Sequence, residues 1–163
     1  MSGSPPIHFV EVTTRALEGL PDARGDSVRS MLAADHDILM GDVRVSLGYQ
    51  VQAEMTPEQI ERTVYDLFAD PVIEDGSCNG ALLGATGIFP STPEAAIQVG
   101  FKPGVTDNAG QAGLDGLLTL YPKLRNAAQV ATSRTYLFWG LPEGIELSHL
   151  ANALHNPMIE RCA

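Results

Sequence analysis

A cysteine flanked by glycines, in the run Gly76-Ser77-Cys78-Asn79-Gly80, is the clearest candidate for chemistry in this chain. In a nucleophile elbow, a sharp turn between a strand and a helix exposes the sulfur and points backbone amides at an oxyanion. An elbow needs a buried apolar strand before it, but Glu74-Asp75 precedes this run. No downstream histidine and acid are spaced to activate the thiol. We therefore interpret the run as part of a linker and predict no catalytic residue.

The other polar residues and glycines do not predict a metal or phosphate site. None of the four histidines has a Cys, Asp or Glu at a metal-ligand spacing; they are His8, His36, His149 and His155. No glycine-rich loop follows a strand and opens a helix, as a phosphate cradle requires. Gly110, Gly113 and Gly116 fall inside an expected helix, where we expect them to allow close packing. The sequence therefore predicts no metal ligand and no cofactor-binding residue.

Charge and composition exclude several classes of partner. The chain has 163 residues, 44% of them hydrophobic, and a formal net charge of −10. Such a charge repels nucleic acid and anionic membrane surfaces, so we expect neither as a partner. No apolar run approaches the roughly 20 residues that a membrane helix needs. Two unmatched cysteines and no targeting pattern after Met1 lead us to expect free thiols and a cytoplasmic location.

One pattern occurs twice, about 86 residues apart, and organises the chain. Asp70-Pro71-Val72-Ile73-Glu74 returns as Asn156-Pro157-Met158-Ile159-Glu160, and Asp22 and Asp107 each precede an apolar helical stripe. A fixed long period indicates one supersecondary unit used twice. We assign residues 1–75 to the first repeat, with a third strand extending to about residue 84. Residues 76–94 form a linker rich in Gly and Pro, and residues 95–163 form the second repeat.

Each repeat reads as strand, helix, long strand, helix, strand. Asp22 and Asp107 are predicted N-caps of the first helices, and Thr56 heads a capping box. Pro71 and Pro157 are predicted to stop the second helices. Alternating residues predict long strands at 43–53 and 130–139, with a bulge at Gly48. In the second repeat, strand 97–101 and helix 145–155 complete the order.

These elements predict an α+β fold of two β-α-β-α-β units. Because each helix buries one stripe, we expect the helices on one face of each sheet, and the two units packed as a pseudo-twofold dimer. The second repeat ends three residues after Glu160, so we expect it to lack its last strand and the chain to be a piece of a longer protein. The oligomeric state stays open, because another chain could supply that strand.

Several stretches resemble a known family. In the first repeat they are Asp22-Ala23-Arg24-Gly25, Val43-Arg44-Val45, and the segment 67–75, Leu-Phe-Ala-Asp-Pro-Val-Ile-Glu-Asp. They are similar to the PurS subunit of phosphoribosylformylglycinamidine synthase. Segments 99–107 and 132–137 of the second repeat resemble the matching half of the large fused form of that enzyme. The chain departs from the pattern at Leu47, where the family favours a basic residue that Arg134 keeps.

The resemblance implies a role in purine biosynthesis, in a ligase of the glutamine amidotransferase type. ATP activates the formylglycinamide oxygen of the substrate, and ammonia from glutamine displaces it. ATP and Mg are implied for the intact enzyme, with no cofactor in this chain. The family's PurS-like regions hold synthetase and glutaminase together, so these are the implied partners. Lys102 and Arg134 are candidate interface residues. The alternative is a tandem α+β regulatory module that binds a small molecule between the repeats.

Overall fold

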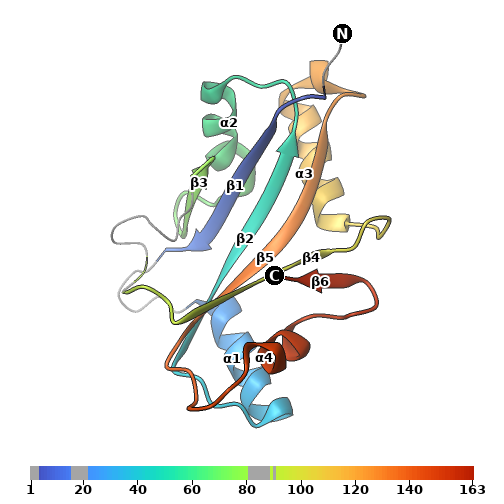
Figure 1. Cartoon of the computed structure of the whole chain (residues 1–163). Coiled ribbons are helices and arrows are strands. Elements are labelled where there is room, and N and C mark those ends of the chain that lie inside the picture. Colours follow the sequence, from blue (N-terminus) through green and yellow to red (C-terminus); the bar gives the residue numbers. More distant parts are fainter. Residues whose placement is uncertain (1–3, 16–21, 81–88, 90) are drawn as a thin grey trace.

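Six strands form one antiparallel sheet, and four α-helices pack against it, so the fold is α+β (Figure 1). The computed structural model describes residues 4–15, 22–80, 89 and 91–163, and all counts concern these residues. The strands are β1 Ile7–Thr14, β2 Asp42–Gln52, β3 Glu74–Cys78, β4 Ala95–Phe101, β5 Gln129–Trp139 and β6 Glu160–Cys162. The helices are α1 Ala23–His36, α2 Pro57–Thr63, α3 Asn108–Leu120 and α4 Leu147–Leu154. A π-helical turn, η1 (Val64–Phe68), continues α2, and a 3-10 turn, Pro122–Leu124, follows α3.

The strand order is β3-β1-β2-β5-β4-β6, so it reads third, first, second of one half and then second, first, third of the other. The long strands β2 and β5 join the halves in an unbroken antiparallel register from Asp42 opposite Trp139 to Gln52 opposite Gln129. The expectation of a separate sheet for each unit is therefore wrong. The halves share one continuous sheet because their longest strands pair edge to edge and leave no unpaired strand between them.

Both hydrophobic clusters of the core draw on both halves of the chain. In one, Leu32 of α1 packs with Leu150 of α4 and Phe138 of β5. In the other, Ile60 of α2 packs with Leu117 of α3 and Val51 of β2. Figure 1 shows α1 and α4 at one end of the central strands and α2 and α3 at the other. Each first helix is therefore combined with the second helix of the other half.

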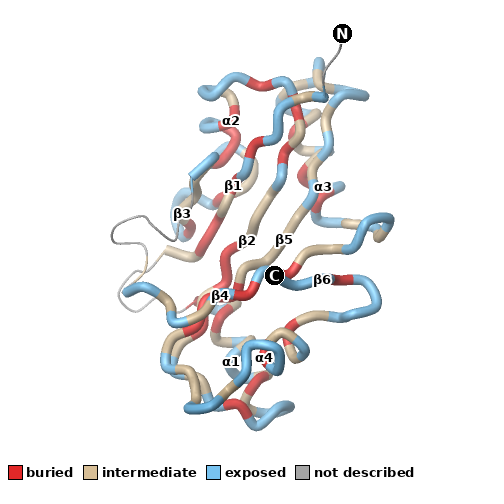
Figure 2. The backbone as a smooth tube through the Cα atoms, viewed as in Figure 1, coloured by how far each residue is buried: buried red, intermediate tan, exposed pale blue. Residues whose placement is uncertain are grey.

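Most of the buried strand residues lie on the face of the sheet that carries the helices, and Thr13, Ser46 and Leu137 are buried on the opposite face. Across the central pair, Val43 faces Phe138 and Val45 faces Tyr136, and all four are buried. Figure 2 shows buried segments along these strands and exposed segments at the outer turns. The opposite face carries polar residues such as Gln50 and Gln98. The helices thus cover one face and leave much of the other to solvent.

The last strand, which we expected to be missing, is present as β6. Its three residues pair with β4, with Val99 opposite Cys162 and Phe101 opposite Glu160. It matches β3, which pairs with β1 at the other edge of the sheet. Three residues are too few for alternation to reveal a strand in the sequence. The expectation that the second repeat stops before its last strand is therefore wrong.

The third strand of the first half starts later than Val72. Asp70 opens a tight turn in which its side-chain Oδ1 accepts the Val72 amide at 2.9 Å and its carbonyl accepts the Glu74 amide at 2.8 Å. The strand therefore begins at Glu74 and ends at Cys78, within the segment assigned to the linker. The expected extension over residues 81–84 lies outside the described residues.

Gly48 does not form the bulge that its place in a strand predicts. The registers of β2 with β1 and with β5 both run through Gly48 without an extra residue. A Cβ atom at this position would lie 2.5 Å from the Ser133 Oγ atom. Gly48 therefore neither bulges nor bends the strand, and it leaves room for the Ser133 hydroxyl across the sheet.

The capping box and the proline stops predicted for the second helices lie where the sequence places them. Thr56 and Gln59 form a reciprocal capping box, with N···O distances of 2.8 and 3.2 Å. The η1 turn ends at Phe68 ahead of Pro71, and α4 ends at Leu154 ahead of Pro157. No helix in the described part of the chain is long and apolar enough to span a membrane.

Candidate functional site

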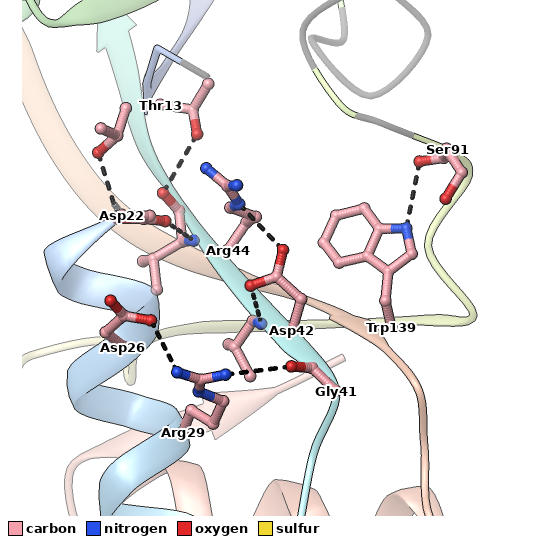
Figure 3. A network of polar contacts seen from close by, with 12 residues as sticks. Thr13, Asp22, Asp26, Arg29, Gly41, Asp42, Arg44, Ser91 and Trp139 are labelled. Atoms are coloured by element: carbon pink, nitrogen blue, oxygen red, sulfur yellow. Dashed lines mark hydrogen bonds and ion pairs between the residues drawn. The ribbon is translucent and has the colours of Figure 1, made fainter. Parts of the chain in front are cut away.

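An aspartate at the start of the first helix in each half ties that helix to the sheet. Asp22 caps α1 by accepting the Arg24 amide at 3.2 Å. Its other oxygen accepts the Val45 amide of β2 at 3.1 Å (Figure 3). Asp107 caps α3 through the Gly110 amide at 2.7 Å and accepts the Thr132 amide of β5 at 2.6 Å. One carboxylate therefore fixes both the start of a helix and its position on a strand.

A glycine three residues after each aspartate lets the helix approach the strand closely. A Cβ atom on Gly25 would lie 1.8 Å from the Val43 carbonyl oxygen, and one on Gly110 would lie 2.6 Å from that of Val130. Both distances are far below van der Waals contact. The other two glycines of α3 face η1, where a Cβ on Gly116 would meet Leu67 at 2.4 Å. The glycines of α3 thus serve close packing, as the sequence predicted.

The repeated turn ends in a buried glutamate in both halves. Glu74 is 7% exposed and Glu160 is 8% exposed. Each accepts the backbone amide four residues earlier, on Asp70 and on Asn156, and both distances are 2.8 Å. A buried carboxylate requires a cationic partner as well as hydrogen bonds.

The two glutamates take that cation from different elements. Arg24 of α1 reaches Glu74, with 2.7 Å between its Nη2 atom and Oε1. Arg134 of β5 reaches Glu160, with 2.5 Å between the corresponding atoms. Ala109 stands in α3 where α1 has Arg24, two residues after the capping aspartate. Both halves therefore have a buried glutamate at the same position of the repeat. The arginine that compensates its charge comes from a helix in the first half and from a strand in the second.

Arg134 lies opposite Leu47 at the junction of the halves. These two residues are 87 residues apart and hold matching positions in the repeat. Val43 and Val130 show the same spacing, and each lies against the glycine of its own half's first helix. A residue paired with its own counterpart marks the local symmetry centre of the central strands. The chain has one cation at this centre, where two equal halves would carry two.

A cavity of about 180 Å³ opens beside this centre, on the face that carries the helices. Its walls come from β2 of the first half and from β4, β5, α3 and β6 of the second. They include Leu47, Tyr49, Val99, Phe101, Ala109, Thr132, Arg134 and Glu160. We refer to it as the seam cavity. Burial raises the pKa of the Tyr49 phenol; Arg24 opposes the shift, and Glu74 and Asp107 add to it. Tyr49 is therefore an uncharged wall of the cavity at neutral pH.

A wider groove of about 530 Å³, with a lining of mixed polarity, runs over the opposite face of the sheet. Phe9, Gln50, Gln98, Ala131 and Arg161 contribute to its lining. Phe9 is 57% exposed there. The groove spans both halves of the chain, because residues of both central strands line it.

Cys78 does not occupy a nucleophile elbow. It is the last residue of β3, opposite Val10 of β1, and Asn79 follows it with a hydrogen bond back to Phe9. Burial raises the pKa of its thiol, and Glu61 adds to the shift. A protonated thiol on an edge strand is a poor nucleophile.

Lys102 and Arg134, the two candidate interface residues, lie in different surroundings. The Lys102 ammonium donates to the Pro157 carbonyl and so holds the turn before β6. Arg134 is partly exposed, with 43% of its side chain accessible, and pairs with Glu160. The structure thus gives each cation an internal partner and brings only Arg134 to the seam cavity. The sequence left open a small-molecule site between the repeats, but of the residues that line the cavity it singled out only Arg134 as a candidate site residue.

Within the described residues, no group of three or more His, Cys, Asp or Glu side chains is placed to hold a metal ion. Comparison with known proteins gave no identification: no family model matches the chain, and no curated protein matches its sequence.

Proposed function

We propose that this chain is a non-catalytic bridging region of a phosphoribosylformylglycinamidine synthase. In this proposal it comprises two tandem PurS-like units and holds a synthetase domain and a glutaminase domain together in the cytoplasm. ATP, Mg and the glutaminase thiol belong to those partners. The contribution of this chain is positional: it keeps two active sites close enough for ammonia to pass between them.

The observation that carries the proposal is the paired architecture of the sheet. The strand order is the same from either edge, and the residues that resemble PurS hold matching places in both halves. Asp22 and Asp107 each fix a helix to a central strand, and Glu74 and Glu160 each end a repeated turn. A surface with two similar halves suits a region that must contact two partners.

The test is assembly with the two partners. Synthetase and glutaminase parts of such an enzyme, prepared without their PurS-like region, are mixed with this chain and examined by sedimentation velocity. We expect a complex of all three components that is absent when the chain is left out. Sedimentation of the chain as a separate species in every mixture would contradict the proposal.

The seam cavity favours a second candidate function, a tandem module that binds a small molecule. This cavity lies between the repeats, where such a module would place its ligand. Ligand-induced stabilisation of the isolated chain would support this candidate, and the partner domains are not needed to observe it.

A further inference from the structure

We propose that two apolar turns, one in each half of the chain, are the places where it binds its two partner proteins. The first apolar turn comprises residues 70–73 and the second comprises residues 156–159; each leads into an edge strand of the sheet, β3 or β6. Each turn inserts its apolar side chains into a pocket of one partner. This inference rests on the bridging function and names the surfaces through which it acts.

Both turns hold apolar side chains out in the solvent. In the first turn, Val72 is 70% exposed and Ile73 is 43% exposed. In the second turn, Met158 is 81% exposed and Ile159 is 40% exposed. An exposed proline precedes each pair. Single exposed apolar residues are ordinary on a protein surface, but three in succession at matching places of a repeat indicate a binding surface.

Hydrogen bonds fix both turns in one shape before any partner binds. The side chain of the first residue accepts the backbone amide of the third, at 2.9 Å from Asp70 and at 3.0 Å from Asn156. The residue after β1 and the residue after β4, Arg15 and Lys102, donate their backbone amides to the isoleucine carbonyls of the two turns, at 2.7 and 2.9 Å. A turn that is already rigid loses little conformational entropy when a partner binds it.

The core of the protein does not use these side chains. Within the described residues, Val72, Ile73, Met158 and Ile159 belong to neither of the two hydrophobic clusters. The glutamate that ends each turn is the residue buried against the fold. The apolar surface of the turns is therefore available to be buried against another protein, which is favourable in water.

The two turns differ in charge, which suits two different partners. At three matching positions the first half has a carboxylate and the second half has none: Asp66 and Asn152, Asp70 and Asn156, Asp75 and Arg161. Opposite charges around two surfaces favour their association, and like charges oppose it. The first apolar turn therefore fits an apolar pocket with a basic rim, and the second fits one with a neutral or acidic rim.

The test measures binding of the whole chain to each partner separately. Synthetase and glutaminase parts prepared without their PurS-like region are titrated with the chain by isothermal titration calorimetry. We expect Val72→Ser to weaken binding of one partner at least about tenfold and Met158→Ser to weaken binding of the other by a similar factor, because each loses a buried apolar side chain. Leu39→Ser is the matched control. Leu39 is 73% exposed between α1 and β2, and this variant should bind both partners as the wild-type chain does.

The outcomes separate this inference from the bridging function. If the wild-type chain binds both partners and the two turn variants, folded by circular dichroism, bind them equally well, the inference is overturned and the bridging function stands. Loss of the same partner in both variants would overturn the assignment of one turn to each partner. A wild-type chain that binds neither partner would contradict the bridging function and this inference together.

A charge reversal tests the difference between the turns. Asp66→Lys should weaken binding of the partner that Val72→Ser affects by about threefold and leave the other partner unchanged. Asp35→Lys changes the net charge equally at an exposed position in the last turn of α1, and it should have no effect on either partner. Equal effects of the two lysine variants would overturn the assignment of a basic rim to the first partner.

Discussion

Two buried glutamates each depend on one arginine side chain to compensate their charge. Glu74 and Glu160 each accept one backbone amide of their own turn and one arginine. The amide holds the turn closed, and the arginine compensates the charge that burial would otherwise penalise. Because the arginines come from α1 and β5, the pairs also link the edge strands to the rest of the sheet.

Loss of either arginine should leave a buried glutamate without its cation. We expect Arg24→Met and Arg134→Met each to lower the free energy of unfolding by about 1–3 kcal/mol, a range reduced by the partial exposure of the arginines. Urea unfolding monitored by circular dichroism measures this change. Arg29→Met is the matched control, because its pair with Asp26 is exposed on both sides, and it should change stability by less than about 0.5 kcal/mol. Equal effects at all three positions would contradict the account.

Two tyrosines should make the fold sensitive to alkali. Burial raises the pKa of Tyr49 and of Tyr136 above the ordinary value of 10.0. Because the folded state favours the neutral phenol, this stability is present below pH 10.0 and is lost as the pH rises through the raised values. When phenolate absorbance is followed during an alkaline pH titration, two tyrosines should ionise at higher pH than an ordinary tyrosine. Tyr49→Phe and Tyr136→Phe should each remove one of them, and a late fraction unchanged in both variants would argue against this assignment.

At the scale of elements, the distance between helix and strand is set by glycine. Gly25→Ala and Gly110→Ala place a methyl group against a strand carbonyl oxygen, and we expect each to cost about 1–3 kcal/mol of stability. Gly80→Ala is the control, because the nearest atom to its Cβ would be 3.9 Å away. Thermal unfolding of the three variants measures the difference. Wild-type stability in Gly25→Ala would show that α1 does not need this close approach.

The elements themselves were largely predictable from the sequence, because their signals are local. Asp22, Asp107 and Thr56 cap helices through bonds to residues two or three positions away, and the prolines follow the ends of their helices. The pairing of β2 with β5 was not predictable. Alternation indicates which face of a strand is buried, and it carries no information on which strand lies next to it.

The candidate site could not be predicted from the sequence for a related reason. The cavity arises where Ala109, Glu160 and Leu47 come together from three elements, and none of these residue types signals a site by itself. The repeat did place Arg24 opposite Ala109 in the alignment of the two halves. That difference acquires a meaning only when the structure shows Arg24 on Glu74.

At the scale of the whole molecule, the halves depend on each other. The first helix of each half shares a hydrophobic cluster with the second helix of the other, and the central strands pair along their full length. A half of about 80 residues that loses these contacts keeps only a marginal core.

Separated halves should therefore not fold as monomers. We expect residues 1–80 expressed alone to be unfolded, or to pair through β2 with a second copy. Circular dichroism and light scattering together distinguish these states from a folded monomer. A stable monomeric half with cooperative unfolding would contradict the shared-core account.

The bridging proposal is tested most directly by the coupling of two reactions. The partner synthetase and glutaminase, prepared without their PurS-like region, are assayed for formylglycinamidine ribonucleotide with glutamine or with ammonia as the nitrogen source. If this chain positions the partners, adding it should raise the glutamine-dependent rate and leave the ammonia-dependent rate unchanged. A glutamine-dependent rate that does not respond to the chain would contradict the proposal.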